Sequence, residues 1–140
     1  VEVRSVPAAE LAVDMSAEMG KVARMMGSGA RNVARLFREA SDTDALELFQ
    51  DLLDVTRDFM GMLGVLRERY LGGADEEFTR KAEKLAELLS ELLGEMSEVL
   101  SGEDWILLAD LLEYEFLPLC DEWQEVSGHL HEQMVKRVAQ

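Results

Sequence analysis

The amino-acid sequence predicts an all-α fold: an antiparallel, up-and-down bundle of four helices in one domain covering residues 1–140. Leucine is the most frequent residue and Ile106 is the only isoleucine, a balance that favours helix over strand. Apolar residues recur at steps of three and four along most of the chain, which is the period of a helix with one buried face. Three polar or glycine-containing breaks divide this pattern into four segments with short connections, so neighbouring helices should run antiparallel.

The first helix is expected from about Pro7 to Ala40, because proline suits the first turn of a helix. Gly27 and Gly29 fall within its apolar stripe. Each glycine weakens a helix interior by about 1 kcal/mol relative to alanine. A kink or a break is therefore expected at Gly27–Gly29.

The second helix is expected to start at the polar segment 41–44, where Ser41 and Asp44 have the spacing of a capping box, and to reach about Leu71. The two glycines in segment 71–74 give the clearest turn signal in the chain. A third helix should follow, with acidic residues in its first turn, where they favour the positive end of the helix dipole.

The fourth helix is expected to start at segment 101–104, which again has capping-box spacing. Pro118 removes one backbone hydrogen bond and should kink this helix. Gly128 is expected to end the helix or to bend it into a polar tail.

The charge of the chain restricts its partners. The formal net charge is −15, with 29 acids against 14 bases, and residues 102–127 contain no base. Nucleic acids and anionic membrane surfaces should be repelled, whereas basic partners or divalent cations are compatible ligands. No apolar run approaches the roughly 20 residues that span a bilayer, and charged residues interrupt the N-terminus, so neither a membrane span nor a leader is expected. The single cysteine, Cys120, excludes an internal disulfide and fits the cytoplasm.

Two apolar stripes mark the fourth helix, whereas a helix in an isolated bundle needs one. If the first stripe is buried in the bundle, the second should be partly exposed and available to a partner. Its residues are Ile106, Leu107, Leu111, Tyr114 and Leu117. Such a patch is uncommon on a monomer, so a homodimer with the fourth helix at its interface is expected, unless the first helix or the C-terminal segment covers the second stripe.

The methionines of the first helix provide a second candidate partner surface. Met15, Met19 and Met26 share one stripe. Methionine side chains adapt to irregular neighbours, so these residues either fill the core or line a groove for the amphipathic helix of a partner.

Acidic residues raise an enzymatic alternative. All-α nucleoside-triphosphate pyrophosphohydrolases hold magnesium with ExxE on one helix and ExxD on the next. Glu95 and Glu98 form an ExxE pair here, and Asp110 and Glu113 follow as DxxE, with the two acid types reversed. No ExxH, HExxH or CxxC motif occurs, so the sequence predicts no metal and no cofactor outside this alternative.

Two segments resemble an uncharacterised family of short bacterial helical proteins. They are LLADLLEYEFLPLCDEW, from Leu107 to Trp123, and ARLFREASDTDALELFQDLLD, from Ala34 to Asp54. The resemblance implies a helical fold and a bacterial source, and it implies no reaction.

Together these observations favour a non-enzymatic cytoplasmic interaction module. It would act as an adaptor or a small chaperone-like protein that binds a helical or basic protein partner. The alternative is a magnesium-dependent nucleotide hydrolase of the all-α pyrophosphohydrolase type.

Overall fold

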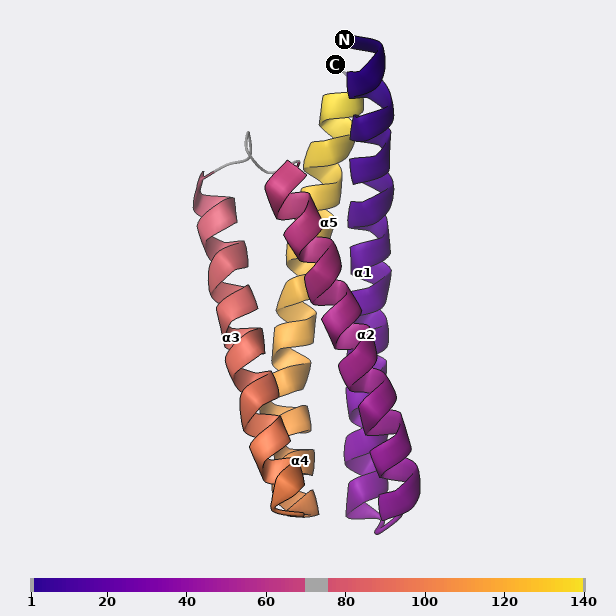
Figure 1. The fold of residues 1–140 in the computed structure, drawn as a ribbon, viewed down its shortest axis with the longest axis vertical. Coiled ribbons are helices and arrows are strands. Elements are labelled where there is room, and N and C mark those ends of the chain that lie inside the picture. Colours follow the sequence, from indigo (N-terminus) through magenta and orange to yellow (C-terminus); the bar gives the residue numbers. More distant parts are fainter. Residues whose placement is uncertain (1, 70–75, 140) are drawn as a thin grey trace.

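The computed structural model describes residues 2–69 and 76–139, and within these ranges all residues except two short connections are helical and none is in a strand. The elements are α1 (Glu2–Arg38), α2 (Asp42–Arg69), α3 (Glu76–Ser101), α4 (Trp105–Leu111), η2 (Leu112–Phe116) and α5 (Leu117–Ala139). α4, η2 and α5 follow one another without a break and form a single last rod. The four rods alternate in direction (Figure 1), so the predicted all-α bundle is confirmed.

The two connections end their preceding helices in the same way. Ala40 and Glu103 have positive φ angles of 60° and 55°. In the first connection the amide of Ser41 donates to the carbonyl of Leu36 (3.0 Å), and Ala40 donates to Phe37 (3.3 Å). This is the Schellman arrangement, in which a left-handed residue closes the helix. The breaks therefore fall where the sequence predicted them, while the expected turn at 71–74 lies outside the described residues.

The expected boundaries of α1 need two corrections. α1 begins at Glu2 rather than at Pro7, and it runs through Gly27 and Gly29 without a break. Tertiary packing explains its continuity at Gly27: a Cβ atom there would lie 3.4 Å from Leu117 Cδ1 and 3.7 Å from Cys120 Cβ. Gly27 is buried against the last rod, and this tertiary packing compensates for the low helix propensity of glycine.

The last rod also differs from expectation. The side chain of Asp104, rather than that of Ser101, caps it by accepting a hydrogen bond from the amide of Leu107 (3.1 Å). Before Pro118 the chain forms a π-helical turn, η2, in which Leu117 donates to the carbonyl of Leu112. A π turn is one way in which a helix accommodates a proline that cannot donate to the preceding turn.

Gly128 does not end the last helix, which continues to Ala139. Leu130 and Met134, which follow the glycine at helical spacing, are both only 2% exposed. Their burial stabilises the helix beyond the glycine.

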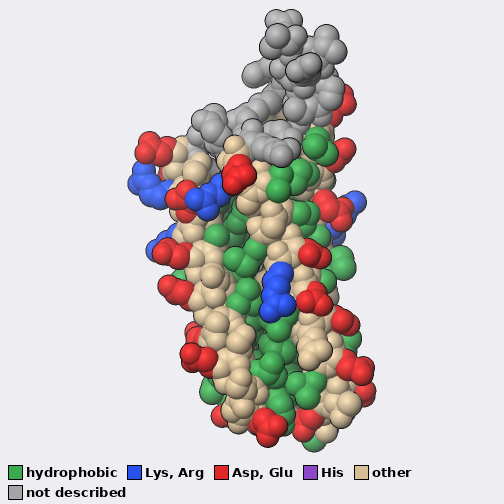
Figure 2. Space-filling model, in the orientation of Figure 1, with side chains coloured by type: hydrophobic (Ala, Val, Ile, Leu, Met, Phe, Trp, Pro, Cys, Tyr) green, Lys and Arg blue, Asp and Glu red, His purple; other side chains and the backbone are tan. Residues whose placement is uncertain are grey.

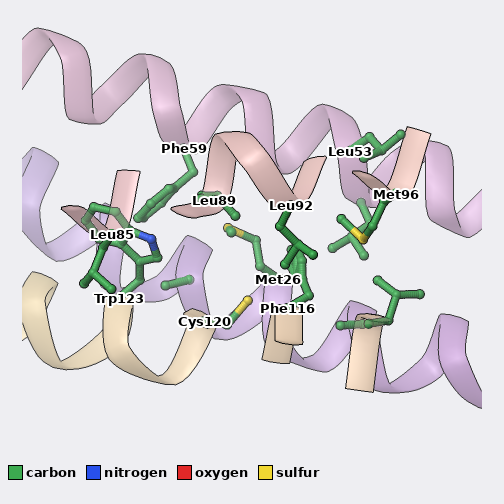
Figure 3. Packing of buried hydrophobic residues seen from close by; sticks show 14 of the residues in the cluster. Met26, Leu53, Phe59, Leu85, Leu89, Leu92, Met96, Phe116, Cys120 and Trp123 are labelled. Atoms are coloured by element: carbon green, nitrogen blue, oxygen red, sulfur yellow. The ribbon is translucent and has the colours of Figure 1, made fainter. Parts of the chain in front are cut away.

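The core lies along the middle of the bundle, where side chains from all four rods meet (Figure 3). The rings of Phe59 on α2 and Trp123 on α5 meet edge to face, with centroids 5.1 Å apart. α1 packs against α2 and along the whole last rod, and α3 packs on α4, η2 and α5, whereas α2 and α3 scarcely approach each other within the described residues. No described helix contains an apolar stretch long enough to cross a bilayer.

Candidate partner-binding surface

The exposed apolar stripe expected on the last helix is present in part. Tyr114 is 68% exposed, Ile106 55% and Leu107 43%. Leu117 is half-buried. The prediction is wrong for Leu111, which is only 6% exposed. α4 packs against both α1 and α3, and a helix between two neighbours buries a wider arc than a helix with one.

A groove of about 310 Å³ lies where α3 faces η2 and α5. Its lining residues are Leu88, Glu91, Leu92, Glu95, Glu115, Pro118, Leu119 and Glu122. The apolar residues come from both sides: Leu88 and Leu92 belong to α3, and Pro118 and Leu119 belong to α5. Tyr114 lies one helical turn before Pro118, so the exposed stripe leads toward this groove. We call it the acidic groove.

The remaining lining residues of the acidic groove are four glutamates, Glu91, Glu95, Glu115 and Glu122, and none of its lining residues is a base. All four are exposed, and within the described residues none of them forms an ion pair. Apolar residues among unpaired carboxylates suit a ligand that is apolar on one side and cationic at its edges.

The four carboxylates of the hydrolase alternative do not converge. Arg38, at the end of α1, donates to Asp110 (2.8 Å) and to Glu113 (2.7 Å). The hydrogen bond to Asp110 makes the largest contribution to raising the pKa of Arg38, and the bond to Glu113 raises it further. Glu95 lines the acidic groove, and Glu98 is exposed on α3. Among the described residues, no group of three or more His, Cys, Asp or Glu side chains is arranged to hold a metal ion.

The predicted methionine groove does not form as expected. Met19 and Met26 are 1% and 0% exposed and belong to the core, while Met15 is half-buried. The methionine that reaches the surface is Met25, which is 60% exposed and borders a hollow of about 160 Å³ between α1 and α2. α1 packs against both α2 and the last rod, and these two neighbours cover Met19 and Met26.

A family model, described as a domain of unknown function, DUF8042, matches residues 14–126. The chain belongs to this family. Neither a curated protein nor a solved structure matches the chain. The part that matches the DUF8042 model starts within α1 and ends within α5, so it contains the acidic groove, the Arg38 ion pairs and the three exposed residues of the last helix.

The sequence did not predict two polar links between distant parts of the chain. One joins Arg38 to Asp110 and Glu113, which lie 72 and 75 residues further along the chain. The other joins α1 to α5: Ser16 Oγ donates to the carbonyl of Val13 (2.8 Å) and lies 3.2 Å from His131 Nδ1. The partners are distant in sequence, and no motif pairs them. The unbalanced charge of the last helix, eight acids and no base in residues 102–127, was the one available sign that a base from elsewhere should face it.

Proposed function

We propose that the protein is a non-enzymatic interaction module whose acidic groove binds a basic amphipathic helix of a partner protein. The observation that carries this proposal is the composition of the groove: four apolar residues, four unpaired glutamates and no base. An adaptor or a chaperone-like holder would use such a site in the same way. The lone, buried cysteine is compatible with a cytoplasmic location.

Both parts of the groove would contribute to binding. Covering a large apolar side chain contributes roughly 1.5–3 kcal/mol, part of which is lost in ordering the partner. The glutamates would steer a cationic segment toward the groove and select against acidic ones, because the net charge of −15 repels polyanions. Tyr114, Ile106 and Leu107 extend the apolar surface beyond the groove, and all three are exposed.

The pyrophosphohydrolase alternative receives less support. It requires Glu95, Glu98, Asp110 and Glu113 to surround a magnesium ion, whereas Asp110 and Glu113 bind Arg38. A positive charge between two of the proposed ligands opposes binding of a divalent cation.

A synthetic amphipathic helix with leucine on one face and lysine on the other tests the proposal. We expect it to bind, as measured by fluorescence anisotropy, and to bind more weakly as salt rises, because exposed charges are screened over about 8–10 Å at 0.1–0.15 M salt. A scrambled peptide of identical composition shares the charge and lacks the apolar face, so it should bind much more weakly. Equal affinity for the two peptides would contradict the proposal.

Matched variants of the protein locate the site. Reversing two charges of the groove, Glu115→Lys with Glu122→Lys, should weaken binding at least about tenfold, which corresponds to about 1.4 kcal/mol. Glu87→Lys with Glu98→Lys makes the same change in net charge at two exposed positions outside the groove. If both double variants lower affinity equally, the peptide responds to overall charge and the groove is not its site.

A further inference from the structure

The seam between α2 and α3 differs from the other helix contacts. These two helices are consecutive and antiparallel, yet they scarcely approach each other within the described residues. A strip of hydrophobic side chains runs along the seam at the surface (Figure 2). Beneath it, Phe59 of α2 and Leu89 of α3 are fully buried (Figure 3), so the strip is the outer edge of the core.

The register of the two helices identifies the residues along the seam. An ion pair of 3.1 Å between Arg67 and Glu83 fixes the faces that α2 and α3 turn toward each other. Steps of three and four from this pair define two stripes, which we call the seam stripes. They are Leu46, Gln50, Leu53, Arg57, Met60, Gly64 and Arg67 on α2, and Glu83, Ala86, Ser90, Leu93, Ser97 and Leu100 on α3. The apolar members other than Leu53 are half-buried, and therefore partly open to solvent.

The seam stripes contain a single acid, Glu83, which Arg67 neutralises. The remaining charge is Arg57, which lies 3.4 Å from Asp54, with both side chains more than two-thirds exposed. The other exposed members of the seam stripes are uncharged: Gln50, Gly64, Ser90 and Ser97. In a chain with 29 acids among 140 residues, this face combines apolar surface with almost no negative charge.

We infer that the seam stripes form the interface with a second copy of this chain. A two-fold contact places a surface against a copy of itself, so on a surface that carries acids and no bases an unpaired acid finds no base across the contact. For a protein of net charge −15, a self-contact is favourable only where acids are absent or paired. The seam satisfies this condition, while the acidic groove, with four unpaired glutamates, does not.

The charge pattern also favours the seam stripes over the dimer interface that the sequence predicted. The sequence predicted a homodimer through the last helix, where Ile106, Leu107 and Tyr114 are exposed. Glu113 is paired with Arg38, but Glu115, which also flanks Tyr114, forms no ion pair within the described residues, so a two-fold contact there would bring in an unpaired carboxylate from each copy. The seam offers apolar surface without this repulsion.

Gly64 is compatible with this contact. It is exposed in the second half of α2, and apart from its own helix backbone no atom of the described residues lies within 4 Å of the position its Cβ would occupy, as is also true of Gly61, Gly94 and Gly128. A glycine at such a place weakens the helix by about 1 kcal/mol relative to alanine and allows no closer contact within the chain. A second copy packed against the seam would use the close backbone approach that glycine permits.

The dimensions of the seam suit a modest dimer. The α2 stripe is about 30 Å long at 1.5 Å per residue, and two neighbouring helices are about 20 Å wide. A contact over the full outward width of both helices, with the seam stripes at its centre, would bury about 600 Å² on each copy and about 1,200 Å² in total, which lies at the lower limit of specific, stable interfaces.

Sedimentation equilibrium over a range of protein concentrations tests this inference. We expect the mean mass to rise from 15.7 kDa toward twice that value as concentration increases. The response to salt should be opposite to that of peptide binding: added salt should strengthen the dimer, because it screens the repulsion between two copies of charge −15. A monomer at every concentration and salt would overturn the inference, whatever the peptide experiment shows.

Two glycine substitutions locate the interface. Gly64→Glu places a charged side chain in the seam, whereas Gly128→Glu places it at an exposed position on α5 where a Cβ atom also meets nothing within 4 Å. Both replace a helical glycine in open space, so both should fold, as checked by circular dichroism. We expect Gly64→Glu to raise the dimer dissociation constant at least about tenfold and Gly128→Glu to change it less than about twofold. An equal response of the two variants, or no response to Gly64→Glu, would place the interface elsewhere.

Discussion

Cys120 lies where α1 packs against the last rod: a Cβ atom at Gly27 would stand 3.7 Å from the Cβ atom of Cys120. Burial raises the pKa of its thiol to about 12, the charge of Asp121 adds to the rise, and Arg31 opposes it. The folded protein therefore keeps this thiol neutral at any ordinary pH. A neutral, buried thiol is a poor nucleophile, so Cys120 acts as a small core residue.

This shift makes the stability of the protein depend on alkaline pH. An unfolded cysteine has a pKa of about 8.5, so above this value the unfolded chain loses a proton that the folded protein retains. The free energy of unfolding should therefore fall as pH rises through about 8.5, by roughly 1–2 kcal/mol at pH 10. Urea denaturation at pH 7 and pH 10 measures this loss.

Cys120→Ala provides the control for that experiment. All other titratable groups are present in both proteins, so the difference between the two pH responses belongs to the thiol. Identical responses of the parent and the variant would show that Cys120 does not contribute.

Arg38 acts as a link between distant parts of the chain. Its guanidinium joins the end of α1 to Asp110 and Glu113 of the last rod. All three side chains are more than a third exposed, so solvent screens these ion pairs and each should contribute little to stability. Arg38 also occupies Asp110 and Glu113, two of the four carboxylates that the hydrolase alternative requires as magnesium ligands.

The helices illustrate which features a local pattern can predict. The two described breaks have strong turn signals, and the structure places them at Ser41 and at Asp104. Gly128 carries the same local signal and has no such effect, because Leu130 and Met134 continue the buried face beyond it. Turn propensity predicts a helix end where burial stops, and burial depends on which helices become neighbours.

Gly128→Ala separates these two influences in an experiment. In a continuous helix with open space around its Cβ position, alanine should raise the free energy of unfolding by about 0.5–1 kcal/mol, because alanine has the higher helix propensity. Chemical denaturation gives this value directly. A glycine that ended the helix in the left-handed conformation would give the opposite result, a loss of stability on substitution by alanine.

Pairing between helices also explains which parts of the candidate site were predictable. The exposure of Ile106, Leu107 and Tyr114 followed from the double stripe of the last helix. The burial of Leu111 did not, because it requires α1 and α3 to flank the same helix. The acidic groove combines residues of α3 with residues of η2 and α5, and no single segment contains its pattern.

Over the whole molecule the dominant quantity is the net charge of −15. Self-repulsion of this size destabilises a compact state, and salt screens it. We therefore expect the melting temperature of the monomer to rise as sodium chloride is added from low to physiological ionic strength, at a protein concentration too low for dimers. Differential scanning fluorimetry measures this change.

The charge-reduced variant Glu87→Lys with Glu98→Lys serves as the control. Its net negative charge is smaller, so its melting temperature should respond less to salt. A melting temperature that falls with salt in the parent protein would indicate that ion pairs such as Arg38–Asp110, rather than repulsion, dominate the electrostatic free energy.

The start of α1 and the end of α5 lie at one end of the bundle, and the connection between α1 and α2 lies at the other (Figure 1). Any group attached to either of these helix ends would therefore be attached at the same end of the bundle. Fluorophores or affinity tags attached there leave the sides of the rods unobstructed. Protein immobilised through a terminus would present both the acidic groove and the seam stripes to solution. Binding of the basic peptide and binding of a second copy could then be measured in turn on the same immobilised sample.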